Sequence, residues 1–170
     1  FTTDEDLLVP VPSLQFCWTT ADGKTFSDQT PKLDLTDEYF GVFQPRPQPG
    51  DALYLGFAES LSQSILNLSV VGRIEGIGVD PTDPPLAWEA WCGEKEWVRC
   101  EVERDETGGL NKPGSIILHM PRGMARRAFA KQPDYWLRLS LIPARTKQPT
   151  YSNSPQVTTI RAATLGGTAE

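Results

Sequence analysis

Prolines and glycines interrupt this chain so often that long helices are disfavoured. The sequence has 15 prolines and 14 glycines among its 170 residues. Proline cannot donate a backbone hydrogen bond and glycine weakens regular elements, so both residues mark turns and the ends of strands. Between them lie short runs in which apolar and polar residues alternate, the pattern of half-buried strands. This distribution predicts short strands joined by turns.

We therefore expect an all-β chain, specifically a β-sandwich of jelly-roll type with about eight antiparallel strands and at most one short helix. Within 65–71, Leu66, Leu68 and Val70 are expected to share one face. The short helix is expected within 121–131, because Met124 and Ala128 are spaced four residues apart. The strands are predicted at 14–18, 24–27, 52–57, 65–71, in the two arms of a hairpin within 85–110, and at 115–120, 135–142 and 157–165.

Residues 85–110 are interpreted as the central hairpin of the domain. This segment contains three of the five tryptophans, Trp88, Trp91 and Trp97, with Gly93 between them where the chain would reverse. Period-two alternation places Trp88 and Trp91 on opposite faces of a strand. Trp88 is expected to point inward, whereas the facing of Trp91 stays open.

The domain organisation is expected to have three parts. Residues 1–36 form an N-terminal entry segment that is partly strand, residues 37–165 form the sandwich, and residues 166–170 lead to a following domain. The sequence starts with Phe1 rather than a methionine. We therefore expect this domain to come from a longer protein.

Charge and cysteine content restrict the partners and the compartment. The net charge of -6 gives no general attraction to nucleic acid or to an anionic membrane. No apolar run reaches the roughly 18 residues that suggest a membrane span. Cys17, Cys92 and Cys100 are expected to be buried free thiols in a reducing compartment. If the hairpin turn centres on Glu94 and Lys95, Cys92 faces Trp97, which argues against a disulfide with Cys100.

The sequence contains no recognisable catalytic set. His119 is the only histidine, and within its apolar run it is expected to pack or to hydrogen-bond as a strand residue. The carboxylates of 101–106 alternate with Val102 and are typical of the solvated face of a strand. We assign no catalytic, cofactor-binding or metal-binding residue, and we expect the protein not to be an enzyme. Whether Asp80 and Asp83 bind Ca²⁺ stays open, because the same loop also fits a plain turn.

Two groups of side chains are candidates for contact with a ligand or a partner. One is aromatic, and it could stack on sugar rings or simply belong to the core. The other is basic, and it could be an ordinary solvated face or contact an acidic protein. The aromatic group is Trp88, Trp91, Trp97, Trp136 and Tyr54, with Trp91 the first residue to examine; the basic group is Arg122, Arg126, Arg127 and Lys131.

From about Tyr39 to Leu165, the chain resembles the baseplate assembly protein family of phage-tail-like, extracellular contractile injection systems. It departs from the family pattern at Cys92–Gly93, where an Asp-Gly or Asn-Gly turn is common, and at Ala87, where a basic residue is common. The residues that carry the resemblance are 52–57, Pro85, Leu86, Trp88, Glu89, Trp91, Trp97, 105–110, 135–138, Ser154, Pro155 and 161–165.

The resemblance implies a structural domain of a large baseplate subunit, without cofactor or catalytic residues. Its partners would be other baseplate proteins of the same particle. It would be assembled in the bacterial cytoplasm and carried in the baseplate of the particle, which can be released from the cell. The alternatives are a carbohydrate-binding module that uses exposed tryptophans and, third, a glycoside hydrolase or lyase.

Overall fold

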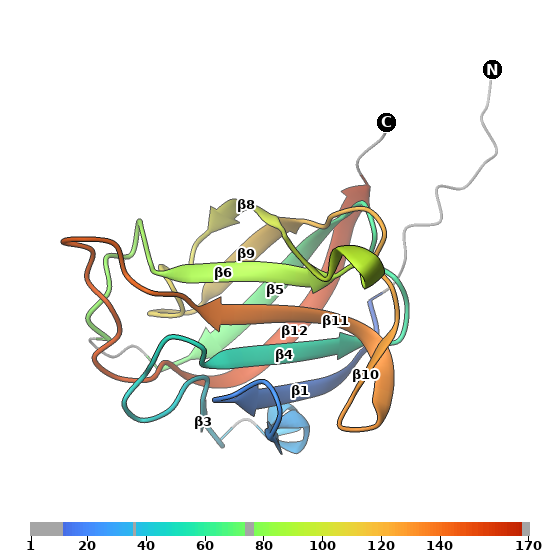
Figure 1. Cartoon of the computed structure of the whole chain (residues 1–170). Coiled ribbons are helices and arrows are strands. Elements are labelled where there is room, and N and C mark those ends of the chain that lie inside the picture. Colours follow the sequence, from blue (N-terminus) through green and yellow to red (C-terminus); the bar gives the residue numbers. More distant parts are fainter. Residues whose placement is uncertain (1–11, 36, 74–76, 168–170) are drawn as a thin grey trace.

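The protein folds into two antiparallel β-sheets that pack face to face, as the computed structural model shows for residues 12–35, 37–73 and 77–167 (Figure 1). The predicted all-β sandwich is confirmed. The strands in chain order are β1 (Leu14–Thr20), β2 (Phe26–Asp28), β3 (Phe40–Gly41), β4 (Ala52–Phe57), β5 (Ser64–Gly72), β6 (Leu86–Trp91), β7 (Trp97–Arg99), β8 (Glu101–Asp105), β9 (Gly114–His119), β10 (Arg127–Phe129), β11 (Gln132–Leu141) and β12 (Gln156–Gly167).

In the part of the chain that the structure describes, one sheet has seven strands and the other has five. The seven-stranded sheet has the order β2-β1-β4-β11-β6-β7, with β10 paired to β11. The five-stranded sheet has the order β3-β12-β5-β9-β8. Four of the strands, β2, β3, β7 and β10, have only two or three residues. The longer strands are those that the alternation predicted; the jelly-roll subtype stays a prediction.

The core lies between the sheets and is built from the inward residues of both. Leu53 and Leu55 of β4 and Leu139 of β11 are at most 1% exposed. From the other sheet, Leu66 and Leu68 are fully buried in the same cluster. The predicted shared face of β5, which also includes Val70, is confirmed. Burial of each such side chain contributes about 1.5–3 kcal/mol, so this layer is the main source of stability.

The segment 1–36, predicted as an entry segment that is partly strand, contributes β1 and β2 to the seven-stranded sheet. Trp18 pairs with Tyr54 of β4 and with Asp28 of β2. Residues 1–11 and 36 lie outside the described residues, as do residues 168–170 of the predicted exit. Gly166 and Gly167, which were assigned to that exit, are the last residues of β12.

The predicted hairpin within 85–110 is present, but its register differs by one residue. Trp91, not Cys92, pairs with Trp97. The reason is the turn, which is a short 3-10 helix η2 (Gly93–Lys95) followed by Glu96 at φ 58°. The strand does not continue straight after β7. It crosses at Cys100 into the other sheet, where β8 pairs with β9.

The predicted helix within 121–131 is wrong. This segment contains a loop and then β10, which forms a tight hairpin with β11. Met124 is buried but Ala128 is exposed, so the four-residue spacing does not reflect one helical face. The described helices are both 3-10 helices, η1 (Thr30–Asp34) and η2. None of the helices in the described residues has the length and apolar content needed to cross a membrane.

Candidate binding surface

The outer face of the seven-stranded sheet carries a second aromatic cluster. Trp18, Tyr54, Phe129 and Trp136 are buried there, away from the main core. The cause is alternation along strands whose two faces are both apolar. In β4 the odd positions are leucine or phenylalanine and point into the sandwich, whereas Tyr54 points outward. Phe16, Phe26, Trp91 and Trp97 complete the cluster at its margins.

The hairpin of β10 and β11 covers this cluster. The ring of Phe129 stacks on Trp97 at 5.8 Å and meets Trp136 edge-on at 5.5 Å. The indole Nε1 of Trp136 donates to the backbone oxygen of Arg127 at 2.7 Å, which fixes β10 over the sheet. Aromatic pairs at such distances add to the stability gained from buried area alone. The hairpin is therefore a structural cover of the outer face.

Trp91 points outward, onto the margin of this cluster. Its ring meets Trp97 edge-on at 5.4 Å, and both side chains are half-buried. The guanidinium carbon of Arg127 lies 4.0 Å from the centroid of the Trp91 ring and 4.7 Å from that of Phe129. This is the geometry of a cation–π contact, which Arg makes most favourably with Trp. The facing of Trp91, which the sequence left open, is thereby defined.

A second arginine lies over the second tryptophan. The guanidinium carbon of Arg138 is 4.1 Å from the centroid of Trp97, and its Nε donates to Glu89 Oε1 at 3.0 Å. Arg138 and Glu89 are both half-buried, so their ion pair is less screened than one at the open surface. We call the residues Trp91, Trp97, Arg127, Arg138 and Glu89 the Trp91–Arg127 surface.

The structure does not gather the predicted basic group on one face. Arg127 belongs to the Trp91–Arg127 surface, whereas the guanidinium of Arg126 lies 5.8 Å from the ring of Tyr135 and donates to the backbone oxygen of Pro133. Arg122 is exposed in the loop before β10, and Lys131 is exposed in the hairpin turn. Only one of the predicted arginines therefore lies over the candidate tryptophan.

The predicted aromatic group is likewise divided. Trp88 points inward and packs in the main core, as expected. Tyr54 and Trp136 are 3% and 0% exposed, so a ligand does not reach them in this structure. Sequence reasoning missed Phe129, because it lay in the predicted helix. It also missed the role of Arg138, although period-two alternation within the predicted strand 135–142 places Arg138 on the same face as Trp136.

A buried carboxylate lies at the base of the covering hairpin. Asp134 is 1% exposed and lies opposite Arg127 in the register of β10 and β11. Burial raises the pKa of Asp134 to about 6, against the opposing effect of the Arg126 charge. With its amide group oriented toward Asp134, Gln15 donates to both carboxylate oxygens at 3.1 and 2.9 Å. The hydrogen bonds from Gln15 and the charge of Arg126 thus offset only part of the cost of ionising the buried Asp134 carboxyl.

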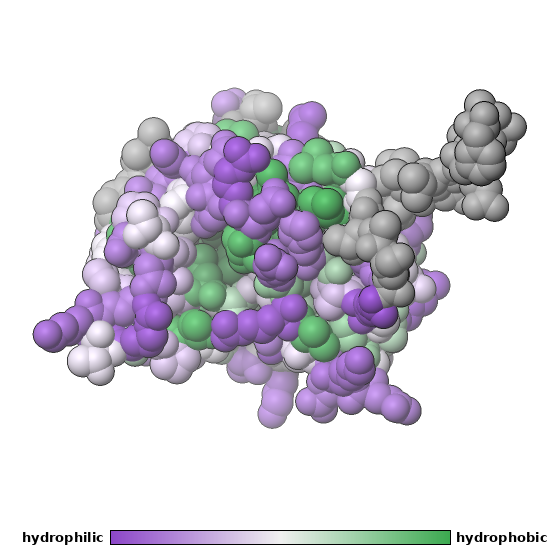
Figure 2. Space-filling model, turned by 90° about the horizontal axis from the view of Figure 1, so that it is seen from above, coloured by the Kyte–Doolittle hydropathy of each residue, from purple (hydrophilic) through white to green (hydrophobic). Residues whose placement is uncertain are grey.

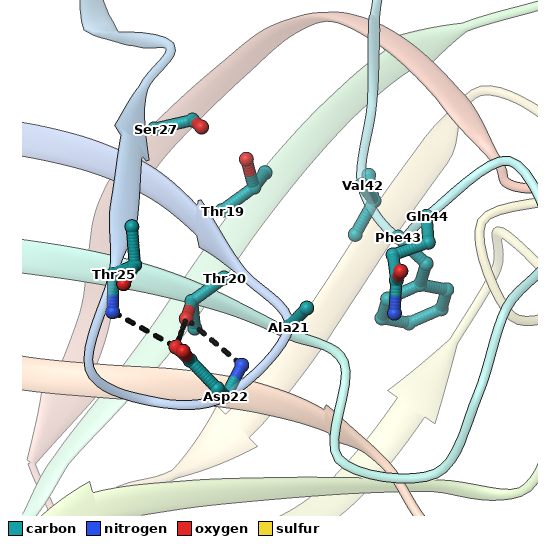
Figure 3. A pocket seen from close by; sticks show the side chains of 9 residues that line it. All are labelled: Thr19, Thr20, Ala21, Asp22, Thr25, Ser27, Val42, Phe43 and Gln44. Carbon is teal, nitrogen blue, oxygen red and sulfur yellow. Dashed lines mark hydrogen bonds between the residues drawn. The ribbon is translucent and has the colours of Figure 1, made fainter.

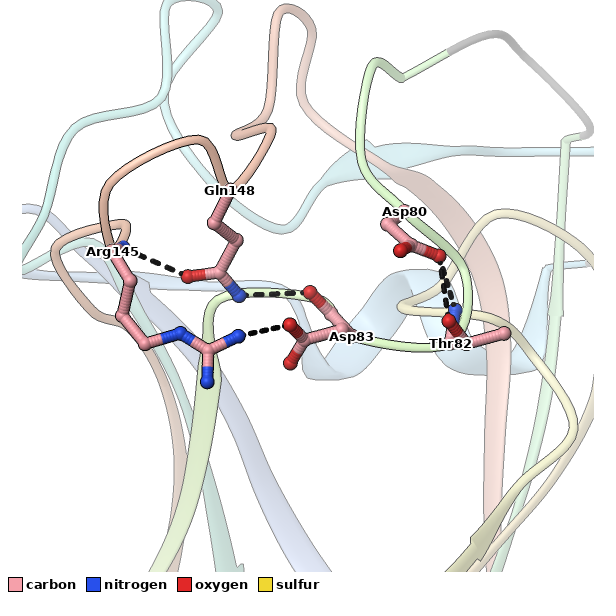
Figure 4. A network of polar contacts seen from close by, with 5 residues as sticks. All are labelled: Asp80, Thr82, Asp83, Arg145 and Gln148. Atoms are coloured by element: carbon pink, nitrogen blue, oxygen red, sulfur yellow. Dashed lines mark hydrogen bonds and ion pairs between the residues drawn. The ribbon is translucent and has the colours of Figure 1, made fainter.

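The carboxylates considered for Ca²⁺ are engaged in loop contacts (Figure 4). Asp80 accepts hydrogen bonds from the backbone N and the hydroxyl of Thr82, which lower the pKa of Asp80. Asp83 pairs with Arg145, and its backbone oxygen accepts from Gln148. These contacts join the loop before β6 to the loop after β11. Among the described residues, no group of three or more His, Cys, Asp or Glu side chains could hold a metal ion.

The other predicted residues have structural surroundings. His119 Nε2 lies 3.1 Å from Glu103 Oε1 across β8 and β9, in the strand position expected of it. The three cysteines are free and buried, as predicted. Burial raises the pKa of Cys100 to about 12, and it raises the pKa of Cys17 further. Their thiols are therefore poor nucleophiles at neutral pH.

A shallow hollow of about 280 Å³ lies between the β1–β2 turn and residues 42–44 (Figure 3). Hydroxyl groups of threonine and serine line much of it. Its carboxylate, Asp22, is used by its own turn, where it accepts from the backbone N of Lys24 and of Thr25 at 2.8 Å. These bonds lower the pKa of Asp22 and leave the hollow without an uncommitted charged group.

Comparison of the chain with models of known protein families and with curated proteins finds no match.

Proposed function

We propose that this chain is a non-enzymatic structural module that makes protein–protein contacts through the Trp91–Arg127 surface. The observation that carries this proposal is the guanidinium of Arg127, 4.0 Å above the half-buried ring of Trp91. Tryptophan and arginine are the residues most enriched at the energetic centres of protein interfaces. Here the sheet and the hairpin hold both side chains in place, so a partner would pay little ordering entropy on binding.

The narrower proposal is that the module belongs to a baseplate subunit of a phage-tail-like contractile particle. It rests on the sequence resemblance, whose residues fall largely on β4, β6, β11 and β12. The partners would be other baseplate proteins. The protein would be assembled in the bacterial cytoplasm and leave the cell only as part of a released particle.

The jelly-roll subtype belongs to the same proposal. Successive strands β4, β5 and β6 alternate between the two sheets, and β11 and β12 do so again. Such alternation is expected of two interlocked Greek keys. The orders β4-β11-β6-β7 and β3-β12-β5-β9 support it.

The test is to produce particles in the cell with a tagged version of the parent protein. We expect the tag to co-purify with the particle and to map to the baseplate by electron microscopy. The substitution Arg127→Glu should reduce incorporation at least tenfold, because it replaces the exposed cation with a charge of the opposite sign. Arg161→Glu, at an exposed position of β12, is the matched control and should incorporate normally. A particle without the tagged protein would refute the baseplate assignment.

The carbohydrate-binding alternative retains Trp91 and Trp97, because both are half-exposed at the margin of the sheet. A sugar stacks on an open ring face, but Arg127 and Arg138 already lie over these rings. Glycan-array binding that disappears in Trp91→Ala would favour this alternative over a protein partner. For the hydrolase or lyase alternative, Glu89 is the half-buried acid on this surface, and it pairs with Arg138 rather than with a second carboxylate.

A further inference from the structure

Between β7 and β8 the chain passes from one sheet to the other, and the two sheets separate along this edge of the sandwich. Up to Arg99 the chain pairs with β6, and Cys100 still donates to the backbone oxygen of Trp88 at 2.9 Å. From Glu101 onward it pairs with β9 of the other sheet. The first half of β6 and the whole of β8 therefore diverge. Among the described residues, β8 is the last strand of its sheet, so no strand pairs with its outer backbone edge.

A groove of about 430 Å³ lies between these two strands. Its apolar lining comes from Leu86, Trp88 and Val102. Trp88 belongs to the main core and presents only a small part of its surface here, whereas Val102 is 44% exposed. Figure 2 shows this face, with hydrophobic residues in a hollow surrounded by hydrophilic ones. We call this cavity the β6–β8 groove.

The rim of the groove is mainly acidic. Asp83, Glu103 and Asp105 line it together with one basic residue, Arg104, and Asp83 is itself paired with Arg145. Arg104 is itself paired with Glu106 at 3.6 Å, and both side chains are largely exposed. Glu101, also exposed, adds another negative charge to β8. The charge of this edge therefore favours a positively charged partner.

Edge strands commonly carry charges and bulges that prevent unwanted pairing, and β8 has both, with a register irregularity between Val102 and Arg104. Protection against unwanted strand pairing accounts for the glutamates of β8. It does not explain an exposed valine next to an opening that reaches a core tryptophan. An edge that repels neutral or acidic strands still accepts a basic one, which makes the charges a filter for partner identity.

We propose that the β6–β8 groove binds an extended, basic segment of a partner protein. The segment would add as a strand to the free edge of β8 and place an apolar side chain over Trp88, between Leu86 and Val102. Its flanking lysines or arginines would face Glu101 and Glu103. This is the β-augmentation mode, in which main-chain bonds supply affinity and pockets for alternate side chains supply specificity. The groove shares no residue with the Trp91–Arg127 surface, so it does not depend on the function proposed above.

The test uses the full chain and a heptapeptide of alternating lysine and valine, followed by fluorescence anisotropy and by NMR of the labelled protein. We expect saturable binding, with the largest shifts in residues 101–105 and in the indole of Trp88. Val102→Arg should weaken binding at least tenfold. Val71→Arg is the control, because Val71 is 46% exposed on the other face of the five-stranded sheet and the substitution adds the same charge.

An alternating glutamate and valine peptide should not bind. Equal losses in Val71→Arg and Val102→Arg would mean that the peptide senses only net charge, which would overturn the proposal. Lack of saturable binding by the wild-type protein, or shifts confined to β6 and β7 around Trp91, would also overturn it. Since Val102 and Val71 are both exposed to a similar extent, both arginine variants should fold, and far-UV circular dichroism checks that they do.

Discussion

At the scale of single residues, Asp134 is the side chain whose protonation most affects the outer layer. The folded protein raises its pKa to about 6, whereas an unfolded carboxyl titrates near 4. Between these values the folded state binds the proton more tightly than the unfolded state. Raising the pH through this window therefore lowers the free energy of unfolding.

We expect urea unfolding to show a loss of about 1 kcal/mol between pH 4 and pH 6.5. Asp134→Asn should flatten this dependence and make the protein more stable than wild type above pH 6, because no buried charge then forms. Asp80→Asn is the control and should keep the slope, since hydrogen bonds lower the pKa of Asp80 and its effect falls below this window. An unchanged slope in Asp134→Asn would contradict the assignment.

Gly56 is a second residue with a sharp steric constraint. A Cβ at this position would lie 2.9 Å from Cζ3 of Trp136 and 3.1 Å from Oδ2 of Asp134. Trp136 is fully buried and cannot move away cheaply. We expect Gly56→Ala to destabilise the protein by about 2 kcal/mol or more, measured by thermal or urea unfolding. Full stability in this variant would show that the outer layer repacks freely.

At the scale of elements, the turn that joins β10 and β11 has a backbone conformation that is unfavourable for its two residues. Phe129 pairs with Gln132, so Ala130 and Lys131 form a two-residue loop, at φ 46° and 66°. This is the conformation of a type I′ turn, which favours Asn-Gly because side chains with a Cβ resist positive φ. The packing of Phe129 over the aromatic cluster offsets this cost.

Replacing the turn with Asn-Gly, as Ala130→Asn combined with Lys131→Gly, should therefore raise the free energy of unfolding by about 1 kcal/mol. Ala128→Gly is the matched control, because this exposed residue lies in the strand, where glycine should lower stability. Both effects are measured by urea unfolding. Loss of stability in the double variant would mean that Ala130 and Lys131 make contacts that outweigh the strain of the turn.

The sequence predicted elements better than it predicted their surroundings. Short apolar runs located β4 and β9 closely, and apolar patterning also located β5, β11 and β12, because each of these strands has one or both faces in a core. Such patterning could not reveal the outer aromatic cluster, which forms only when strands distant in sequence become neighbours. Period-two alternation correctly placed Trp88 and Trp91 on opposite faces of the strand, but alternation alone does not say which of the two faces other residues cover. The helix prediction failed because Met124 and Ala128, although four residues apart, do not share one buried face.

At the scale of the whole molecule, the two apolar layers share the strands of one sheet. β4 and β11 contribute leucines to the main core and Tyr54 and Trp136 to the outer cluster. A strand cannot lose one layer and keep the other without exposing a large apolar area. We therefore expect the sandwich and its outer aromatic layer to unfold as one cooperative unit.

Near-UV circular dichroism, which reports mostly on the aromatic cluster, and far-UV circular dichroism, which reports on the sheets, should give the same urea midpoint. Phe129→Ala should shift both midpoints together, with a loss of about 3 kcal/mol, because Phe129 belongs to the outer cluster and the two layers are coupled. Leu68→Ala, in the main core, should shift both in the same way. If the near-UV signal of Phe129→Ala is lost at lower urea than the far-UV signal, the hairpin opens independently. The outer tryptophans would then be accessible to a ligand while the sandwich stays folded, and the carbohydrate-binding alternative would gain the open ring faces that it requires.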